Sequence, residues 1–225
     1  MTAVVLVVAK APVPGEAKTR LARTVGDGVA ADIAAAALLD TLSAAEGTGL
    51  SVVVAWSGDM AYAARRREVE AALRRCAVIS QRGRGLAERL VNAHRDASSE
   101  VGRPVVQIGM DTPQVTAAQL RAAAGELGGH DAALGMAADG GWWLLGSRSP
   151  VYVEGLGEVA MSREDTGECT LAALAEVGAE VALLEALRDV DTAPDAWSVA
   201  GHPTCGPRFI AAMAACRSTS NRRSG

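Results

Sequence analysis

Short apolar runs rich in β-branched residues alternate with longer Ala- and Leu-rich segments along most of this 225-residue chain. Residues 4–8 read Val-Val-Leu-Val-Val, and a continuous run of this kind is typical of a strand buried on both faces. An Ala/Leu-rich segment at 29–46 ends at Gly47, as helices commonly do. The same alternation recurs further along the chain. It predicts a mostly parallel sheet with helices on both faces, because parallel strands need crossover connections.

No fixed-period repeat and no Gly/Ser-rich linker divides the predicted elements into two domains. Strands are predicted at residues 4–8, 51–55, 77–79, 104–108, 131–136, 142–145, 181–184 and 188–190. Helices are predicted at residues 29–46, 61–75, 86–98, 116–127, 162–177 and 207–216. We therefore predict an α/β fold, a single Rossmann-like three-layer α/β/α domain with a mostly parallel mixed sheet over residues 1–216. Residues 217–225 are predicted to be a disordered polar tail.

Composition argues against several classes of protein. The formal net charge is −4, so the chain lacks the basic surface that binds a duplex nucleic acid. No apolar run approaches the roughly 18 residues of a membrane span, and the run at 3–9 is too short for a signal peptide. The four cysteines form no Cys-x-x-Cys pair, which argues against a zinc site or a disulfide framework. We expect a cytoplasmic protein that binds neither nucleic acid nor membranes; its oligomeric state is left open.

Ligands of doubly wound sheets bind outside the carboxyl ends of the strands, so polar residues that follow strands are the first candidates. The loop after the first strand contains Pro14 and Gly15, which exclude regular structure. It carries three cations: Lys10, Lys18 and Arg20. Three cations in a rigid loop suit an anion with several charges, such as a nucleoside di- or triphosphate; the alternative is a solvated basic loop. Neither a Walker A loop nor Gly-x-Gly-x-x-Gly follows this strand.

Two aspartates are candidate metal ligands. Asp111 lies in Gly-Met-Asp-Thr-Pro after the strand predicted at 104–108, a suitable place to hold Mg²⁺ against phosphates; the alternative is a turn-forming residue. Asp191 ends the stretch Asp-Val-Asp, and alternation along a strand would place Asp189 and Asp191 on one face. Asp191 is then a second metal ligand, or else a turn or capping residue.

The segment Asp139-Gly140-Gly141 joins two predicted strands. Its glycines allow the backbone to approach a ligand closely or to turn tightly into the next strand. Trp142 and Trp143 then point to opposite faces, so only one of them can line a site.

The order of the motifs is informative. Lys-Ala-Pro-x-Pro-Gly-x-x-Lys-Thr-Arg-Leu, Gly-x-Asp-x-Pro, Asp-Gly-Gly and Asp-Val-Asp-Thr follow one another along residues 4–197. This set resembles domain-of-unknown-function family 2064 (DUF2064), which is often described as glycosyltransferase-A-like. It is similar, more distantly, to the 2-phospho-L-lactate guanylyltransferases. The resemblance implies a nucleotide-diphospho-sugar-transferase fold of GT-A type that binds a nucleotide with a divalent metal, Mg²⁺ or Mn²⁺.

The resemblance also implies roles for individual residues. The phosphate ligands would be Lys10, Lys18 and Arg20, and the metal ligands Asp111 and Asp191. The catalytic group would consist of Lys18, Arg20 and Asp111. Further nucleotide contacts would come from Pro14, Gly15, Gln81, Asp139, Gly140 and Gly141. At 84–89 the chain reads Arg-Gly-Leu-Ala-Glu-Arg, where the family usually has Gly-Asp-Leu-Gly-Glu-Arg.

We expect a nucleotidyltransferase that joins a nucleoside monophosphate from a triphosphate to a small phosphorylated or carboxylate acceptor and releases pyrophosphate. Such an enzyme needs little beyond alignment of the reactants and neutralisation of charge. The first alternative is a glycosyltransferase that uses a nucleoside-diphospho-sugar on the same fold. The second is a nucleotide-binding protein without turnover, which only the departure within residues 81–89 favours. The expected partners are small molecules.

Overall fold

The computed structural model describes residues 3–98 and 102–223. Within them, seven strands form one sheet in the order β3-β2-β1-β4-β6-β5-β7. The strands are β1 Val4–Lys10, β2 Ser51–Ser57, β3 Ala77–Ser80, β4 Val105–Gly109, β5 Ala132–Ala137, β6 Trp142–Ser147 and β7 Val181–Leu187. Neighbouring strands are parallel except at β6, which runs antiparallel to β4 and β5. The predicted mostly parallel mixed sheet is confirmed.

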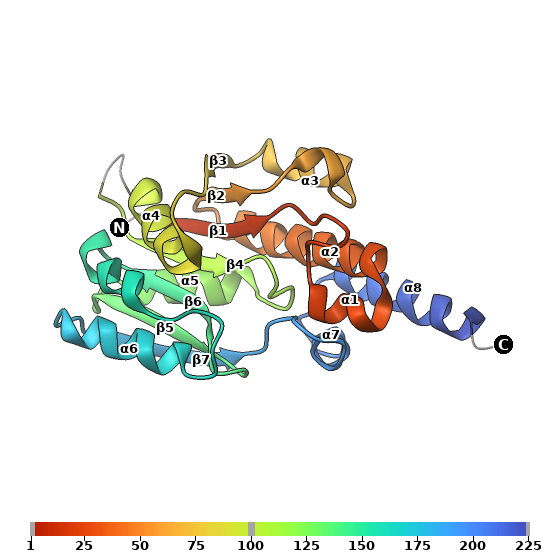
Figure 1. The fold of residues 1–225 in the computed structure, drawn as a ribbon. Coiled ribbons are helices and arrows are strands. Elements are labelled where there is room, and N and C mark those ends of the chain that lie inside the picture. The colour runs from red at the N-terminus through yellow and green to blue at the C-terminus, as the bar shows by residue number, and fades with distance from the viewer. Residues whose placement is uncertain (1–2, 99–101, 224–225) are drawn as a thin grey trace.

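Helices cover both faces of the sheet (Figure 1). The helical elements are α1 Thr19–Val25, α2 Asp27–Glu46, η1 Met60–Tyr62, α3 Arg66–Leu73, α4 Gly85–Ser98, α5 Ala117–Glu126, η2 Pro150–Glu158, α6 Thr166–Glu176, α7 Ala193–Ala200 and α8 Pro207–Arg223. Val5 and Val7 of β1 pack in the apolar cluster that includes α2, α3 and α5, whereas Val4 and Leu6 pack in the cluster that includes α4. This two-sided burial explains the continuous apolar run of the first strand.

A separate apolar cluster lies beyond the sheet, on the side to which the arrowhead of β1 points in Figure 1. Leu21 of α1, Ala196 of α7 and Phe209 of α8 are fully buried in it, together with Ile33 and other residues of α2. The cluster packs α1 against α7, although the two helices are far apart in sequence. It therefore brings the loop after β1 close to the segment after β7.

Several predicted elements differ from the structure. Residues 188–190 are not a strand, because β5 ends at Ala137 and leaves the chain beyond Leu187 without a strand to pair with. Helix α1 begins at Thr19, inside a region predicted as irregular, and is stabilised by burial of Leu21 rather than by a sequence signal at its start. The helix predicted at 61–75 is divided into η1 and α3, and η2 was not predicted.

Helix α8 continues to Arg223, through most of the segment predicted as a disordered tail at 217–225. The Arg217 guanidinium lies 4.8 Å from the centre of the Trp197 ring on α7, a cation–π contact just past the predicted end of the helix. Residues 224 and 225 lie outside the described residues.

Helix α2 is long and apolar enough to cross a membrane by length and composition alone, the one helix of the described residues for which this holds. However, 72% of its apolar window is buried inside the protein. Its residues Ala30, Ile33 and Leu38 are fully buried against the sheet and against the cluster beyond it. Helix α2 is therefore the central helix of the fold.

Burial of His94 on α4 makes the protein sensitive to acid. His94 is 1% exposed, and its Nε2 has no hydrogen-bond partner. Burial lowers the His94 pKa from 6.5 to about 3. Between these two values only the unfolded chain takes up the proton, so the free energy of unfolding should fall by up to about 1.4 kcal/mol per pH unit as the pH decreases.

The substitution His94→Gln should remove this part of the acid sensitivity. We expect urea unfolding between pH 7 and pH 4 to show a shallower pH dependence than in the wild type. His202→Gln is the control, because His202 is exposed. Equal pH dependence in His94→Gln and the wild type would contradict the prediction.

Candidate active site

Three segments that follow strands meet at the carboxyl edge of the sheet through ion pairs. The Lys18 Nζ lies 2.6 Å from Asp111 Oδ2 and 3.8 Å from Asp191 Oδ1. The Arg20 Nη1 lies 2.6 Å from Asp191 Oδ2. Asp111 and Asp191, here called the carboxylate pair, are thus joined by one lysine ammonium. The structure brings together four of the residues singled out in the sequence.

The backbone before α1 places Lys18 between the two carboxylates. Gly15 adopts a φ of 81°, and the N–H groups of Glu16 and Ala17 both donate to the Val13 carbonyl oxygen. Lys18 itself has a left-handed backbone, with φ 50° and ψ 49°, which is uncommon for a residue other than glycine. The Lys18 side chain is only 13% exposed.

Asp111 is held by the backbone on both sides. A Cβ at Gly109 would lie 2.6 Å from Asp111 Oδ1, so glycine is required there for the observed carboxylate position. The Val190 N–H donates to the Asp111 carbonyl oxygen at 3.0 Å, and Gln114 Nε2 donates to the Arg188 carbonyl oxygen. These two hydrogen bonds join the segment after β7 to the segment after β4, which sets Asp191 beside Asp111.

The pKa values of Lys18 and Asp189 both depart from their ordinary values. Burial alone would lower the Lys18 pKa, but the charge and hydrogen bond of Asp111, with the charges of Asp191 and Asp189, raise it above its ordinary value. Burial, aided by the charges of Asp111 and Asp139, raises the Asp189 pKa to about 6, whereas Lys18 lowers it. Asp189 therefore belongs to the charge network, a role that its predicted strand position did not indicate. The site is a network of paired charges in which Lys18 and Arg20 lie against Asp111 and Asp191.

The two remaining cations of the first loop are more exposed. The Arg20 side chain is 63% exposed. Lys10 Nζ donates to the Glu16 carbonyl oxygen at 3.2 Å and lies 3.6 Å from the Glu16 carboxylate, an exposed pair within the loop. Because Lys10 contacts Glu16 rather than the carboxylate pair, it remains available to a ligand that approaches from solvent.

Gln81 uses its side-chain amide in the fold. Its Nε2 donates to the carbonyl oxygens of Ala9 and Ala55, both at 2.9 Å, which ties the carboxyl ends of β1 and β2 together. Gln81 therefore shapes the edge of the sheet next to the first loop.

The segment 139–141 turns tightly against another part of the chain. Asp139 Oδ1 accepts a hydrogen bond from Gly141 N–H at 2.9 Å. Gly140 has a φ of 89°, and a Cβ there would lie 1.8 Å from the Glu164 carbonyl oxygen. The Gly167 N–H donates to the Gly140 carbonyl oxygen at 2.8 Å. The close approach at Gly140 is thus to the protein's own backbone.

The two tryptophans that follow pack on opposite faces of the sheet, as alternation predicts. Trp143 is buried beside the α2 face, and its Nε1 donates to the Glu185 carbonyl oxygen at 3.0 Å. The Trp142 Nε1 donates to Thr170 Oγ1 on α6 at 3.2 Å. Both rings are integrated into the core clusters.

Comparison with known proteins places this chain in a family. The family model described as uncharacterized proteins conserved in bacteria, DUF2064, matches residues 19–163. The chain belongs to the DUF2064 family. The matched part contains Arg20, Asp111 and segment 139–141, whereas Lys18 and Asp191 lie outside it. Among curated proteins, none is a significant match to this DUF2064 chain.

Solved structures agree on the fold. One similar structure is a protein from Desulfovibrio desulfuricans G20 whose suggested activity is nucleotide-diphospho-sugar transfer. It is 28% identical with a TM-score of 0.74, and the match covers 85% of this chain and 84% of that chain. A nucleotidyl transferase from Methanothermobacter thermautotrophicus has 16% identity and a TM-score of 0.58, with 88% and 95% covered. Rv0371c from Mycobacterium tuberculosis H37Rv has 20% identity and a TM-score of 0.53, with 88% and 96% covered. The DUF2064 chain thus has the fold of nucleotidyl and nucleotide-sugar transferases.

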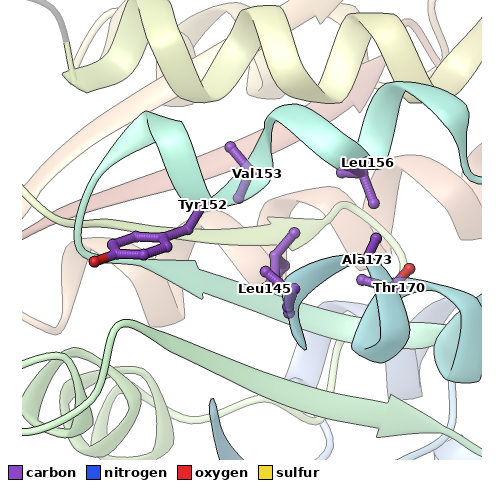
Figure 2. A pocket seen from close by; sticks show the side chains of 7 residues that line it. Leu145, Tyr152, Val153, Leu156, Thr170 and Ala173 are labelled. Atoms are coloured by element: carbon purple, nitrogen blue, oxygen red, sulfur yellow. The ribbon is translucent and has the colours of Figure 1, made fainter. Parts of the chain in front are cut away.

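Two hollows of the DUF2064 chain contain none of the residues singled out in the sequence. One lies between β6, η2 and α6, where Leu145, Val153 and Leu156 point toward one another (Figure 2). It has no room for a water molecule, so it is a closed apolar contact. The other, about 200 Å³, is an open groove lined by residues of α2, α3 and α8. The ion pairs of the candidate site therefore identify it better than either of these hollows does.

Alanine at Gly140 should destabilise the DUF2064 chain severely. The added Cβ would overlap the Glu164 carbonyl oxygen, and the φ of 89° is unfavourable for alanine. We expect the free energy of unfolding in urea to fall by about 3 kcal/mol. Gly129→Ala is the control, since its Cβ would have no atom within 4 Å, and it should change stability by less than about 1 kcal/mol. Similar stabilities for the two variants would contradict the packing argument.

Proposed function

We propose that this DUF2064 protein is a metal-dependent nucleotidyltransferase. It would join a nucleoside monophosphate, taken from a nucleoside triphosphate, to a small phosphorylated or carboxylate acceptor. The observation that carries the proposal is the convergence of Lys18 and Arg20 with Asp111 and Asp191 at the carboxyl edge of the sheet. The DUF2064 membership and the nucleotidyl-transferase fold support it.

The cations of the first loop match the charge of a triphosphate. Lys18 directly precedes α1, and Arg20 lies in its first turn. Lys10 is the last residue of β1. Arginine can bind two phosphate oxygens at once, while a lysine ammonium acts as a point charge. Together the three side chains would bind the phosphates and stabilise the charge that develops on departing pyrophosphate.

A divalent metal fits the carboxylate pair. The Lys18 ammonium contacts both carboxylates, so one positive centre can already be shared between them. Carboxylate oxygens are the ligands that Mg²⁺ and Mn²⁺ prefer. No three His, Cys, Asp or Glu side chains of the described residues gather as a metal cluster, so Asp111 and Asp191 would share the metal with substrate phosphates. When bound, the metal would supply charge neutralisation at the phosphates.

The reaction needs no general base from the protein. An acceptor oxygen that is already anionic attacks the α-phosphorus, the bond to the β-phosphate oxygen breaks, and the electron pair leaves with pyrophosphate. The histidines are used elsewhere: His94 is buried on α4, His130 contacts Glu126, and His202 contacts Thr204. The side chains of the site would align the reactants and stabilise charge.

Glycosyl transfer from a nucleoside-diphospho-sugar is the second candidate. It is favoured by the 28% identity to the Desulfovibrio protein of that suggested activity. The charge interaction of Asp189 with Asp111 adds support, because it brings an Asp-x-Asp stretch to the site. Lys18 and Arg20 at the site, with Lys10 nearby in sequence, favour a triphosphate over a diphosphate, so we place nucleotidyl transfer first.

A thermal-shift panel distinguishes these functions. Each nucleoside triphosphate and each common nucleoside-diphospho-sugar is tested with and without Mg²⁺. A ligand at one hundred times its Kd stabilises the native state by about 2.7 kcal/mol, which is readily measured. We expect stabilisation by one triphosphate, increased by Mg²⁺. Stabilisation by a diphospho-sugar alone would replace the proposal with glycosyl transfer, and no response to any nucleotide would overturn both.

A further inference from the structure

Lysine is rare in this protein, and its use at the site is selective. Of the 22 lysine and arginine residues, only Lys10 and Lys18 are lysines; Lys10 is the last residue of β1, and Lys18 directly precedes α1. Lys18 is the one that contacts the carboxylate pair. An ammonium is a compact, strongly hydrated point charge on a flexible stem, whereas guanidinium is broad and planar. Of the two cationic side chains, lysine therefore comes closer to a metal ion in size and charge distribution.

The carboxylate pair is closed to a second cation in the observed arrangement. Asp111 is neutralised by Lys18 at 2.6 Å, and Asp191 is shared between Arg20 at 2.6 Å and Lys18 at 3.8 Å. A divalent ion approaching without an anion would meet the Lys18 charge at short range. It would have to separate the ammonium from both carboxylates before it could bind them.

We propose that Lys18 excludes divalent metals from Asp111 and Asp191 until a nucleoside triphosphate draws its ammonium onto the phosphates. This inference rests on the proposed function, since it takes the triphosphate as the ligand. Metal then binds poorly in the absence of the triphosphate, and the triphosphate binds more tightly once metal is present. By linkage, a nucleotide that raises metal affinity is itself bound more tightly when metal is present.

The first test measures metal binding without nucleotide. Mn²⁺ is titrated into the wild type, Lys18→Gln and Lys10→Gln, and the free ion is followed by its electron paramagnetic resonance signal. Lys10→Gln is a matched control, because it removes the same charge from a nearby position. The Lys10 side chain contacts Glu16 rather than the carboxylate pair. We expect Lys18→Gln to bind Mn²⁺ roughly 5- to 150-fold more tightly than the wild type, the range typical of coupled sites. Equal affinity in the wild type and Lys18→Gln, or an equal gain in Lys10→Gln, would overturn the inference.

The second test observes the wild type and does not depend on Lys18→Gln folding. With ¹⁵N-labelled lysine, the two Nζ resonances are assigned by the loss of one in Lys10→Gln. Metal-free triphosphate should shift the Lys18 resonance, and Mg²⁺ alone should leave it unchanged. A shift caused by Mg²⁺ alone would overturn the inference.

The two tests separate this inference from the proposed function. A triphosphate that stabilises the protein but leaves the Lys18 resonance unchanged would overturn the exclusion by Lys18 and leave nucleotidyl transfer intact. If no triphosphate stabilises the protein, the proposed function fails, and the triphosphate-driven release of Lys18 fails with it.

Discussion

Replacing Asp111 with asparagine is expected to lower kcat/KM for nucleotidyl transfer by about 10³-fold or more while the fold is retained. Asparagine keeps the shape of the side chain next to Gly109, where a Cβ would lie 2.6 Å from Asp111 Oδ1. What is lost is the negative charge that pairs with Lys18 at 2.6 Å and that would hold a metal against the phosphates. Both contributions act where charge develops, so kcat should fall more than substrate affinity.

The measurement is pyrophosphate release with the triphosphate and the acceptor that support turnover by the wild type. In parallel, thermal shift should show that Mg²⁺ no longer increases nucleotide binding. Asp96→Asn is the matched control: Asp96 lies on α4 and pairs with Arg82, outside the site, so the substitution removes a carboxylate charge from a different ion pair. Full activity in Asp111→Asn would remove Asp111 from the mechanism.

The strands could be predicted well because their signal is local. The run at 4–8 is buried on both faces, and a continuous apolar run of that kind in a globular protein is typical of a buried strand. The same holds for the helix start at Thr116, where the side chains of Thr116 and Gln119 form the capping box of α5. Burial periodicity and helix caps act over a few residues, so a single sequence reveals them.

The assembly of the candidate site depends on contacts that no local pattern encodes. The order of the motifs and the general rule for strand ends placed Lys18 and Asp111 at the same edge. The hydrogen bond from Val190 N–H to the Asp111 carbonyl oxygen, however, joins residues nearly eighty positions apart. Asp189 was assigned to a strand face, and its coupling to Asp111 and Asp139 became visible only in the folded arrangement.

The contact partners of the glycines could not be predicted from the sequence either. Gly140 was predicted to allow either a close approach of a ligand or a tight turn into the next strand; the structure shows the tight turn, with the Glu164 carbonyl oxygen against Gly140. A glycine signals a close contact but does not name the partner. A useful signal was nevertheless present in composition. The chain has only two lysines, and both lie within residues 10–18, which indicates that lysine and arginine are not equivalent in that segment.

Alanine at Asp40 is expected to reduce the free energy of unfolding by about 3–5 kcal/mol, the largest stability effect predicted for a single side chain here. Asp40 lies on α2 and is 5% exposed. Its carboxylate accepts hydrogen bonds from Phe209 N–H at 2.8 Å and from Arg208 Nη1 at 3.1 Å, at the start of α8. Alanine would leave a buried donor without a partner, a cavity beside Gly206 and no negative charge at the helix N-terminus.

The same substitution should also disturb the candidate site. The chain leading into α8 is hydrogen-bonded to the segment after Asp111, through Gly206 N–H to the Pro113 carbonyl oxygen at 2.9 Å and Thr204 Oγ1 to the Gln114 carbonyl oxygen at 2.6 Å. Asp40 therefore supports the backbone that positions Asp111, although it does not contact the ion pairs itself.

Urea unfolding and nucleotide thermal shifts test both effects together. Asp40→Asn, which keeps the volume and one acceptor for Phe209 N–H, should lose less stability than Asp40→Ala. Ser43→Ala removes only an exposed partner of Arg208 and should change stability by about 0.5 kcal/mol or less. Nucleotide affinity should follow the order of stability among these variants, because the anchoring of α8 reaches Asp111 through the backbone. A destabilised Asp40→Ala with unchanged nucleotide affinity would show that the site is held by the ion pairs and the β7 segment alone.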